Sequence, residues 1–168
     1  MEKPLVNRVA KSGLITLNLE EYFPSEAVVS FDLKDYLYME LILKEKDFRT
    51  ALKEHDWAQY EGKHIALHCS TDAIVPTWAF MLVTTYAAPY ALSITQGNIE
   101  NVYATHYQKT LAKLDVAQYE NQRIVIKGCS NKPVPVAAYT ELVRLLQPYA
   151  KSIMYGEPCS TVPIYKKK

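Results

Sequence analysis

The sequence predicts a single α/β domain, built from two pseudo-symmetric βαβ-type repeats around a mostly parallel sheet, with extra strands before the repeats. The first observation is an internal duplication, because residues 48–97 recur as residues 107–156, 59 positions later. The clearest echo is the hexapeptide DWAQYE at 56–61, which returns as DVAQYE at 115–120. The second observation is that strand-like and helix-like segments alternate in each copy, which is typical of parallel strands joined by crossover helices. The length of 168 residues suits one domain.

Each copy is expected to contain the same four elements: a polar helical segment, a short strand, a helix entered through proline, and a second strand. Proline suits the first turn of a helix, where its missing N–H is not needed. The first copy places these elements at 44–55, 64–68, 75–88 and 92–95. The second copy places them at 104–114, 123–127, 134–147 and 151–155. Two further strands are expected before the repeats, at 13–19 and 28–33.

The two proline-entered helices differ in their apolar patterns. The helix at 75–88 has no polar side, which predicts a helix buried all round. The helix at 134–147 has one apolar stripe, and Glu141 and Arg144 face away from it, which predicts a surface layer. We interpret the repeated hexapeptide as a turn and packing motif, because it lies at the strand-entry side of each copy.

Composition excludes several classes of protein. Nineteen basic and 18 acidic residues give a net charge of +1, which argues against a strongly basic nucleic-acid-binding protein. No apolar run is long enough to span a membrane, and residues 1–30 do not have the pattern of a secretory signal. We therefore expect a cytoplasmic protein that binds neither nucleic acid nor membranes. Three cysteines are an odd number, so a disulfide framework is not expected.

The three cysteines are the candidate metal ligands. Cys69 and Cys129 each follow a predicted strand, and Cys159 comes three residues after Gly156, past the last predicted strand. Ligands of parallel α/β sheets bind at the carboxyl ends of the strands. Thiolates bind zinc and iron–sulfur clusters, so Cys69, Cys129 and Cys159 predict a metal site. Inert burial and a reactive thiol are the alternatives.

Three residues are candidates for a fourth ligand: His68, Asp72 and Glu100. His68 adjoins Cys69, although neighbouring residues of a strand point to opposite faces. Asp72 precedes a predicted helix, so it could instead cap that helix. Glu100 corresponds to Cys159 when the two repeats are aligned with the offset of 59 residues. His106 is expected on the solvated face of a polar helix and is not favoured.

Three stretches carry a resemblance to a known family: CSTDAIVPTWAFMLV (69–83), KGCSNKPVPVAAY (127–139) and SIMYGEPCSTVPIYKKK (152–168). They resemble an uncharacterised bacterial family, domain-of-unknown-function family 2480. The resemblance supplies no catalytic residues. It does imply an association with the sulfur-mobilisation system for iron–sulfur cluster assembly, because the genes of the family are often neighbours of that system.

The sequence thus predicts a small cytoplasmic accessory protein that binds zinc, or transiently iron–sulfur, through three cysteines. The resemblance adds iron–sulfur assembly proteins as expected partners, and base rates favour a homodimer. One alternative is a metal-free module, in which the Cys-Ser turns before the helices hold an anion or an acidic group of a partner. Another is an enzyme that uses one thiol as a nucleophile, although no base beyond His68 is evident.

Overall fold

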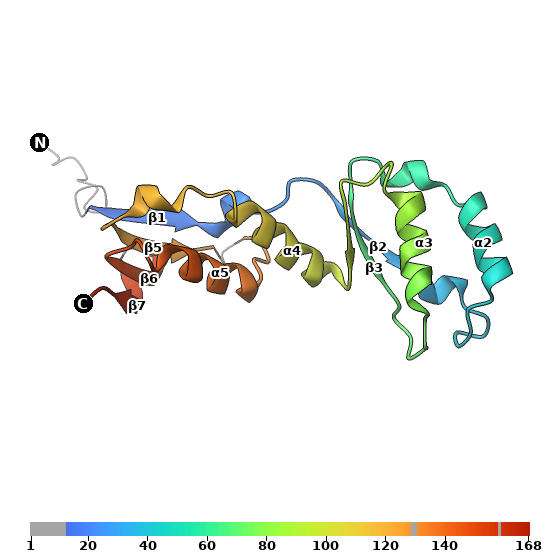
Figure 1. Ribbon diagram of the computed structural model, residues 1–168. Coiled ribbons are helices and arrows are strands. Elements are labelled where there is room, and N and C mark those ends of the chain that lie inside the picture. The colour runs from blue at the N-terminus through green and yellow to red at the C-terminus, as the bar shows by residue number, and fades with distance from the viewer. Residues whose placement is uncertain (1–12, 129–130, 158) are drawn as a thin grey trace, which may run out of the picture. The chain divides into compact units, whose positions relative to one another are not determined.

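The computed structural model describes residues 13–128, 131–157 and 159–168. It confirms a mixed α/β fold with mostly parallel sheets (Figure 1). The chain forms two compact units: unit 1 comprises the described residues within 1–23 and 106–168, and unit 2 comprises residues 24–105. No helix in the described part of the chain is long and apolar enough to cross a membrane.

Unit 2 contains a three-stranded parallel sheet in the order β2-β3-β4. Its strands are β2 (Val28–Asp32), β3 (His64–His68) and β4 (Ser93–Gln96). Helix α3 (Thr77–Ala87) lies beside the strands, and helix α2 (Glu45–Glu54) lies next to α3 (Figure 1). The core between these elements is apolar and includes Phe31, Phe48, Leu52, Ile65, Leu67 and Val83.

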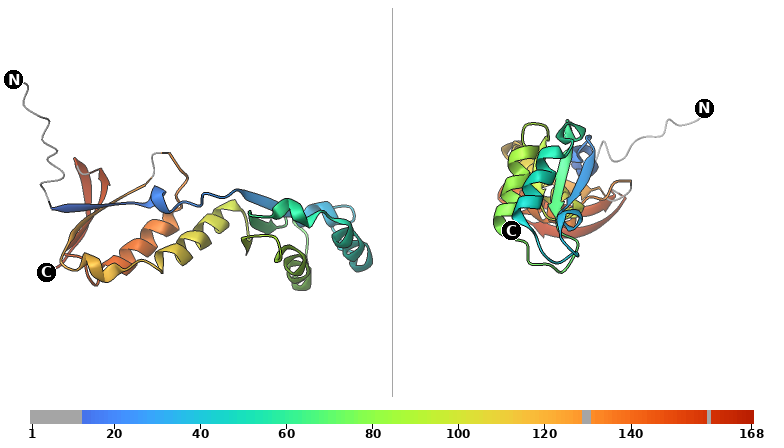
Figure 2. Two further views of the ribbon diagram at one scale, coloured as in Figure 1. Left: turned by 90° about the horizontal axis from the view of Figure 1, so that it is seen from above. Right: turned by 90° about the vertical axis from the view of Figure 1, so that its right-hand side faces the viewer.

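Unit 1 contains a four-stranded sheet in the order β1-β5-β6-β7, in which only β7 is antiparallel. The strands are β1 (Leu14–Asn18), β5 (Arg123–Lys127), β6 (Ser152–Glu157) and β7 (Ser160–Lys166). Helix α5 (Val136–Leu146) and the end of helix α4 (Ile99–Leu111) lie on the same side of β1 (left panel of Figure 2). Their core includes Leu19, Tyr107, Leu111, Ile124, Leu142 and Leu146.

The expectation of one sheet is wrong, because the described strands form two. The central strand of each unit pairs on one side with a strand from before the repeats. Strand β3 pairs with β2, so that Asp32 lies opposite His68. Strand β5 pairs with β1, so that Asn18 lies opposite Lys127. The two N-terminal strand segments resemble each other weakly, as ITLNLEEYF (15–23) and VSFDLKDYL (29–37). Each completes a different copy, and this pairing divides the strands between two sheets.

The duplication extends to the packing of the proline-entered helices. Helices α3 and α5 both have 11 residues and begin after Pro76 and Pro135. The residues that each helix buries occupy equivalent positions, 59 residues apart: Ala79 and Ala138, Val83 and Leu142, Ala87 and Leu146. The two copies therefore use the same helix face against their sheets. A pseudo-symmetric arrangement of the copies stays a prediction.

The repeated hexapeptide is a packing motif, as predicted. In each copy it forms a short 3₁₀ helix, Trp57–Tyr60 and Val116–Tyr119, and buries its tyrosine. The turn that follows contains a residue with a left-handed backbone, which is Gly62 in one copy (φ 69°) and Asn121 in the other (φ 57°). Glycine and asparagine are the residues that adopt this conformation most readily.

Several predicted details differ from the structure. Helix α3 is not buried all round, because Met81 is 64% exposed. Asp72 does not cap it, since the cap residue is Pro76. The polar helix expected at 104–114 runs over Ile99–Leu111, and His106 is not solvated, because its Nε2 lies 2.9 Å from the Tyr22 carbonyl oxygen. Strand β7 was not expected.

An aromatic cluster surrounds His55 in unit 2. The ring of His55 lies between two phenols, with Nδ1 3.2 Å from the Tyr36 hydroxyl and Nε2 2.9 Å from the Tyr60 hydroxyl. Burial lowers the pKa of His55, against a smaller opposing effect of Asp56. Burial also raises the pKa of Tyr60, to about 12. The cluster therefore favours a neutral imidazole between two neutral phenols.

Candidate functional site

The carboxyl ends of strands β2 and β3 carry Asp32, His68 and Cys69 in unit 2. The His68 Nε2 lies 3.8 Å from Asp32 Oδ2, so the imidazole points toward this carboxylate. Cys69 is half-buried, and its thiol donates weakly to the Thr71 carbonyl oxygen at 3.7 Å. Cys69 thus lies at the end of a parallel strand, where the sequence places it.

Asp32 closes the turn that follows Cys69. Its Oδ1 accepts the backbone N–H of Ser70 at 3.0 Å and that of Lys34 at 2.9 Å. Burial opposes ionisation of this carboxyl group, but the hydrogen bonds from Ser70 and Lys34 and the nearby His68 outweigh it and lower the pKa of Asp32. The Ser70 amide, which could have bound an external anion, is therefore engaged by the protein's own carboxylate.

The equivalent turn of unit 1 is also closed by an acidic side chain. The Asn131 N–H donates to Glu20 Oε1 at 2.8 Å. Glu20 follows the end of β1, as Asp32 ends β2. Both turns thus receive an internal carboxylate, although from different positions in the two copies. This arrangement does not support the alternative in which these amides hold an external anion.

The remaining cysteines belong to unit 1. Cys129 lies outside the described residues. Cys159 is exposed and lies in the turn between strands β6 and β7, so it does not follow the last strand. Nearby, Lys127 Nζ forms an ion pair with Glu157 at 3.4 Å. Cys69 belongs to unit 2, and the three-cysteine metal site stays a prediction.

The candidate fourth ligands are separate from one another. His68 faces Asp32, Asp72 is exposed in the turn before α3, and Glu100 is exposed in the first turn of α4. Within residues 13–128, 131–157 and 159–168, no three His, Cys, Asp or Glu side chains form a group that could hold a metal ion. The described residues therefore bring together Asp32 and His68, but no ligand set.

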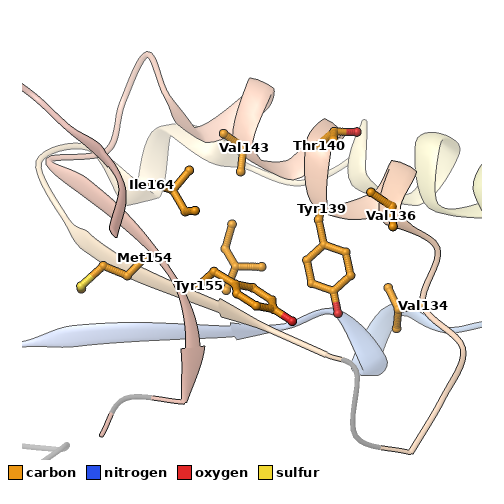
Figure 3. Close-up of a pocket in the computed structure, with 9 residues that line it drawn as sticks. Val134, Val136, Tyr139, Thr140, Val143, Met154, Tyr155 and Ile164 are labelled. Carbon is orange, nitrogen blue, oxygen red and sulfur yellow. The ribbon is translucent and has the colours of Figure 1, made fainter. Parts of the chain in front are cut away.

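The sequence did not predict an apolar groove in unit 1. This groove has a volume of about 620 Å³ and lies between helix α5 and strands β5, β6 and β7 (Figure 3). Tyr139 from α5 and Tyr155 from β6 meet edge to face, with ring centroids 5.7 Å apart. Among the residues that the structure describes, no charged side chain lines the groove, whose other walls are Ile126, Val134, Val136, Thr140, Val143, Met154 and Ile164.

Unit 2 contains a groove at the equivalent place, with a volume of about 750 Å³. Most residues that line it match the groove of unit 1 after the 59-residue offset, including Leu67 with Ile126, Phe80 with Tyr139, Met81 with Thr140, Thr84 with Val143, and Gln96 with Tyr155. The duplication therefore reproduces the groove together with the fold. No local motif marks these residues, because they are ordinary apolar side chains, and only the alignment of the copies could have grouped them.

Fold and site define the chain as a mixed α/β protein whose units each contain an apolar groove between a helix and a mostly parallel sheet. It belongs to the family described as "protein of unknown function (DUF2480)", whose model matches residues 3–167. The resemblance found in the sequence is thereby confirmed. No curated protein matches the chain, and no solved structure does.

Proposed function

We propose that the protein is a binding module whose unit 1 groove takes a small, uncharged and mainly apolar molecule. The observation that carries the proposal is the described lining, which combines aliphatic side chains with two tyrosines and, within the described part of the chain, contains no charged residue. A volume of about 620 Å³ lies within the ordinary range for small-molecule sites. Burial of apolar ligand surface would supply most of the binding free energy.

Polar groups of the lining would orient such a ligand. The rings of Tyr139 and Tyr155 offer flat apolar faces (Figure 3), and the Tyr155 hydroxyl supplies a polar group, whereas the Tyr139 hydroxyl is buried in the wall. The Thr140 hydroxyl donates to the Ala137 carbonyl oxygen at 3.1 Å, so it is held by its own helix. A ligand with a flat ring and one hydrogen-bonding group fits this combination better than a flexible charged one.

The experiment is a fluorescence titration with Nile red, an uncharged apolar dye. We expect saturable binding to the wild-type protein and at least tenfold weaker binding to Thr140→Trp, because the indole would fill the groove from its exposed side. Met81→Trp is the matched control, since Met81 occupies the equivalent position in unit 2. Unchanged binding to Thr140→Trp, or equal losses in both variants, would contradict the proposal.

A second proposal is the metal-binding function that the cysteines predict, with iron–sulfur assembly proteins as partners. It is supported by Cys69, which follows the carboxyl end of strand β3, and by Cys159, which follows strand β6. Elemental analysis of protein purified without chelator or affinity nickel tests it. About one zinc or iron per chain is expected, and a loss of this metal in Cys129→Ser. Metal-free wild-type protein would end this proposal.

A further inference from the structure

We infer that helix α3 and strand β4 of unit 2 form an interface at which a second copy of this chain docks. From Ala73 to Ile99 the sequence contains no Asp, Glu, Lys, Arg or His, although charged residues make up 22% of the chain. The equivalent stretch of unit 1 carries charges throughout, at Lys132, Glu141, Arg144, Lys151 and Glu157. The two copies share one architecture, so the fold does not explain this difference in charge. We attribute it to different surroundings of the two surfaces.

The exposed positions show this difference directly. Arg144 and Glu141 form an ion pair on the outer face of α5, at 2.7 Å. Unit 2 has Thr85 at the position of Arg144, and Leu92 at the position of Lys151. Leu92 is 54% exposed and Met81 64% exposed. The exposed face of α3 consists of Met81 and three threonines, and the hydroxyls of Thr84 and Thr85 donate to carbonyls of their own helix. This face therefore offers solvent no charge and has the character of a covered surface.

Strand β4 adds an open sheet edge beside this helix. In unit 1, strand β6 pairs with β5 on one side and with the antiparallel strand β7 on the other. In unit 2, among the described residues, β4 pairs with β3 alone. The chain turns at Gly97 into helix α4, where unit 1 instead forms a hairpin. Ile164 of β7 also lines the groove of unit 1, whereas the groove of unit 2 has no corresponding wall from an added strand.

A second copy fits this surface better than a partner of another kind. Two β4 strands that run antiparallel about a twofold axis would give each copy the neighbour that β7 gives to β6. Leu92 lies on the same face as Ile94, since alternate residues of a strand share a face, so it would enter the groove region of the opposite copy. When two copies of this uncharged surface meet, no like charges are brought together. A charged partner would need opposite charges on this surface, and residues 73–99 supply none.

The test is sedimentation equilibrium of the full chain at protein concentrations from about 1 to 100 µM. We expect a dimer of the wild-type protein. The variant Thr85→Arg/Leu92→Lys copies the residues of unit 1 into exposed positions, and it should weaken association at least tenfold while its circular dichroism spectrum stays unchanged. Val162→Lys is the control, because Val162 is 57% exposed in unit 1 and its replacement should leave the dimer intact.

Hydrogen exchange supplies a second measurement. Backbone amides of Ser93–Gln96 that face the open edge should exchange slowly in the wild-type dimer and faster in Thr85→Arg/Leu92→Lys. A wild-type protein that is monomeric at every concentration would overturn the inference. A dimer that survives the double substitution, or that is lost in Val162→Lys, would overturn it as well. The ligand proposal concerns unit 1, so neither result decides it.

Discussion

Asp32 accepts the backbone N–H of Ser70 at 3.0 Å, across 38 positions of sequence. The same carboxylate oxygen accepts the N–H of Lys34 at 2.9 Å. One side chain thus joins the end of strand β2 to the turn that follows Cys69. In unit 1 this task is divided, because Asn18 accepts the N–H of Glu20 while the Glu20 side chain accepts that of Asn131.

Asp32→Ala should therefore destabilise the protein more than Asn18→Ala. The first substitution removes the acceptor of two backbone amides, which costs about 1–3 kcal/mol. The second removes the acceptor of one local amide, which costs about 0.5–1.5 kcal/mol. Urea denaturation of both variants measures the difference in the free energy of unfolding. Equal losses would mean that the bond from Ser70 adds nothing to the stability.

The stability of unit 2 should fall on mild acidification because of His55. Burial lowers the pKa of this imidazole below its ordinary value of 6.5, so the folded state binds the proton less readily than the unfolded state. The contribution of neutral His55 to the free energy of unfolding is complete above about pH 6.5. It decreases as the pH falls from there toward the pKa of His55 in the folded state. Urea midpoints from pH 8 to pH 5 should fall, and His55→Gln should reduce the slope. An NMR titration that gives His55 a pKa at or above 6.5 would refute this.

The equivalent positions Leu146 and Ala87 are both fully buried, so they test the packing of the two copies. Leu146→Ala should cost about 2–5 kcal/mol, because it leaves a cavity between α5 and the sheet. Ala87→Leu should cost about 1–3 kcal/mol, because α3 has no space for the larger side chain. Thermal unfolding of both variants provides the measurement. A neutral Ala87→Leu would show that α3 packs less closely than the structure indicates.

Two glycines should respond in opposite ways to substitution. Gly156 has φ 120°, and an added Cβ would lie 2.7 Å from the Ser160 carbonyl oxygen. Gly156→Ala should therefore destabilise the β6–β7 hairpin by about 1–3 kcal/mol. Gly62 has φ 69° with open space around it, and the equivalent Asn121 already adopts this backbone. Gly62→Asn should stay within about 0.5 kcal/mol of wild type, and a larger loss would argue against the equivalence of the two turns.

Much of the local structure could be predicted from the sequence. Strands β3 and β5 have the expected bounds, because short β-rich runs between turns leave little choice. Strand β7 was missed because Pro163 and the lysine tail resemble a solvated end. Pro163 is compatible with this strand since β7 lies at the edge of its sheet, where a missing N–H breaks no ladder.

The arrangement of strands and the grooves could not be predicted in this way. The pairing of β3 with β2 and of β5 with β1 depends on contacts between segments far apart in the sequence. The weak similarity of β1 and β2 does not indicate which strand each of them pairs with. The cysteines can be recognised as candidate ligands in the sequence because thiols carry distinctive chemistry. Val143 and Ile164 have no such distinctive chemistry. They line a groove only because the fold places helix α5 and the edge strand β7 on either side of it.

Unit 2 is inserted between the two segments of unit 1, and this affects the order in which a ribosome delivers them. Residues 24–105 are contiguous, so the whole of unit 2 emerges from the exit tunnel before strand β5 does. Strand β1 emerges first but must wait for a partner that begins about a hundred residues later, which takes about 5–20 s at ordinary rates of synthesis. During this interval strand β1 is exposed without its partner, and chaperones that bind nascent chains would find their target at this strand.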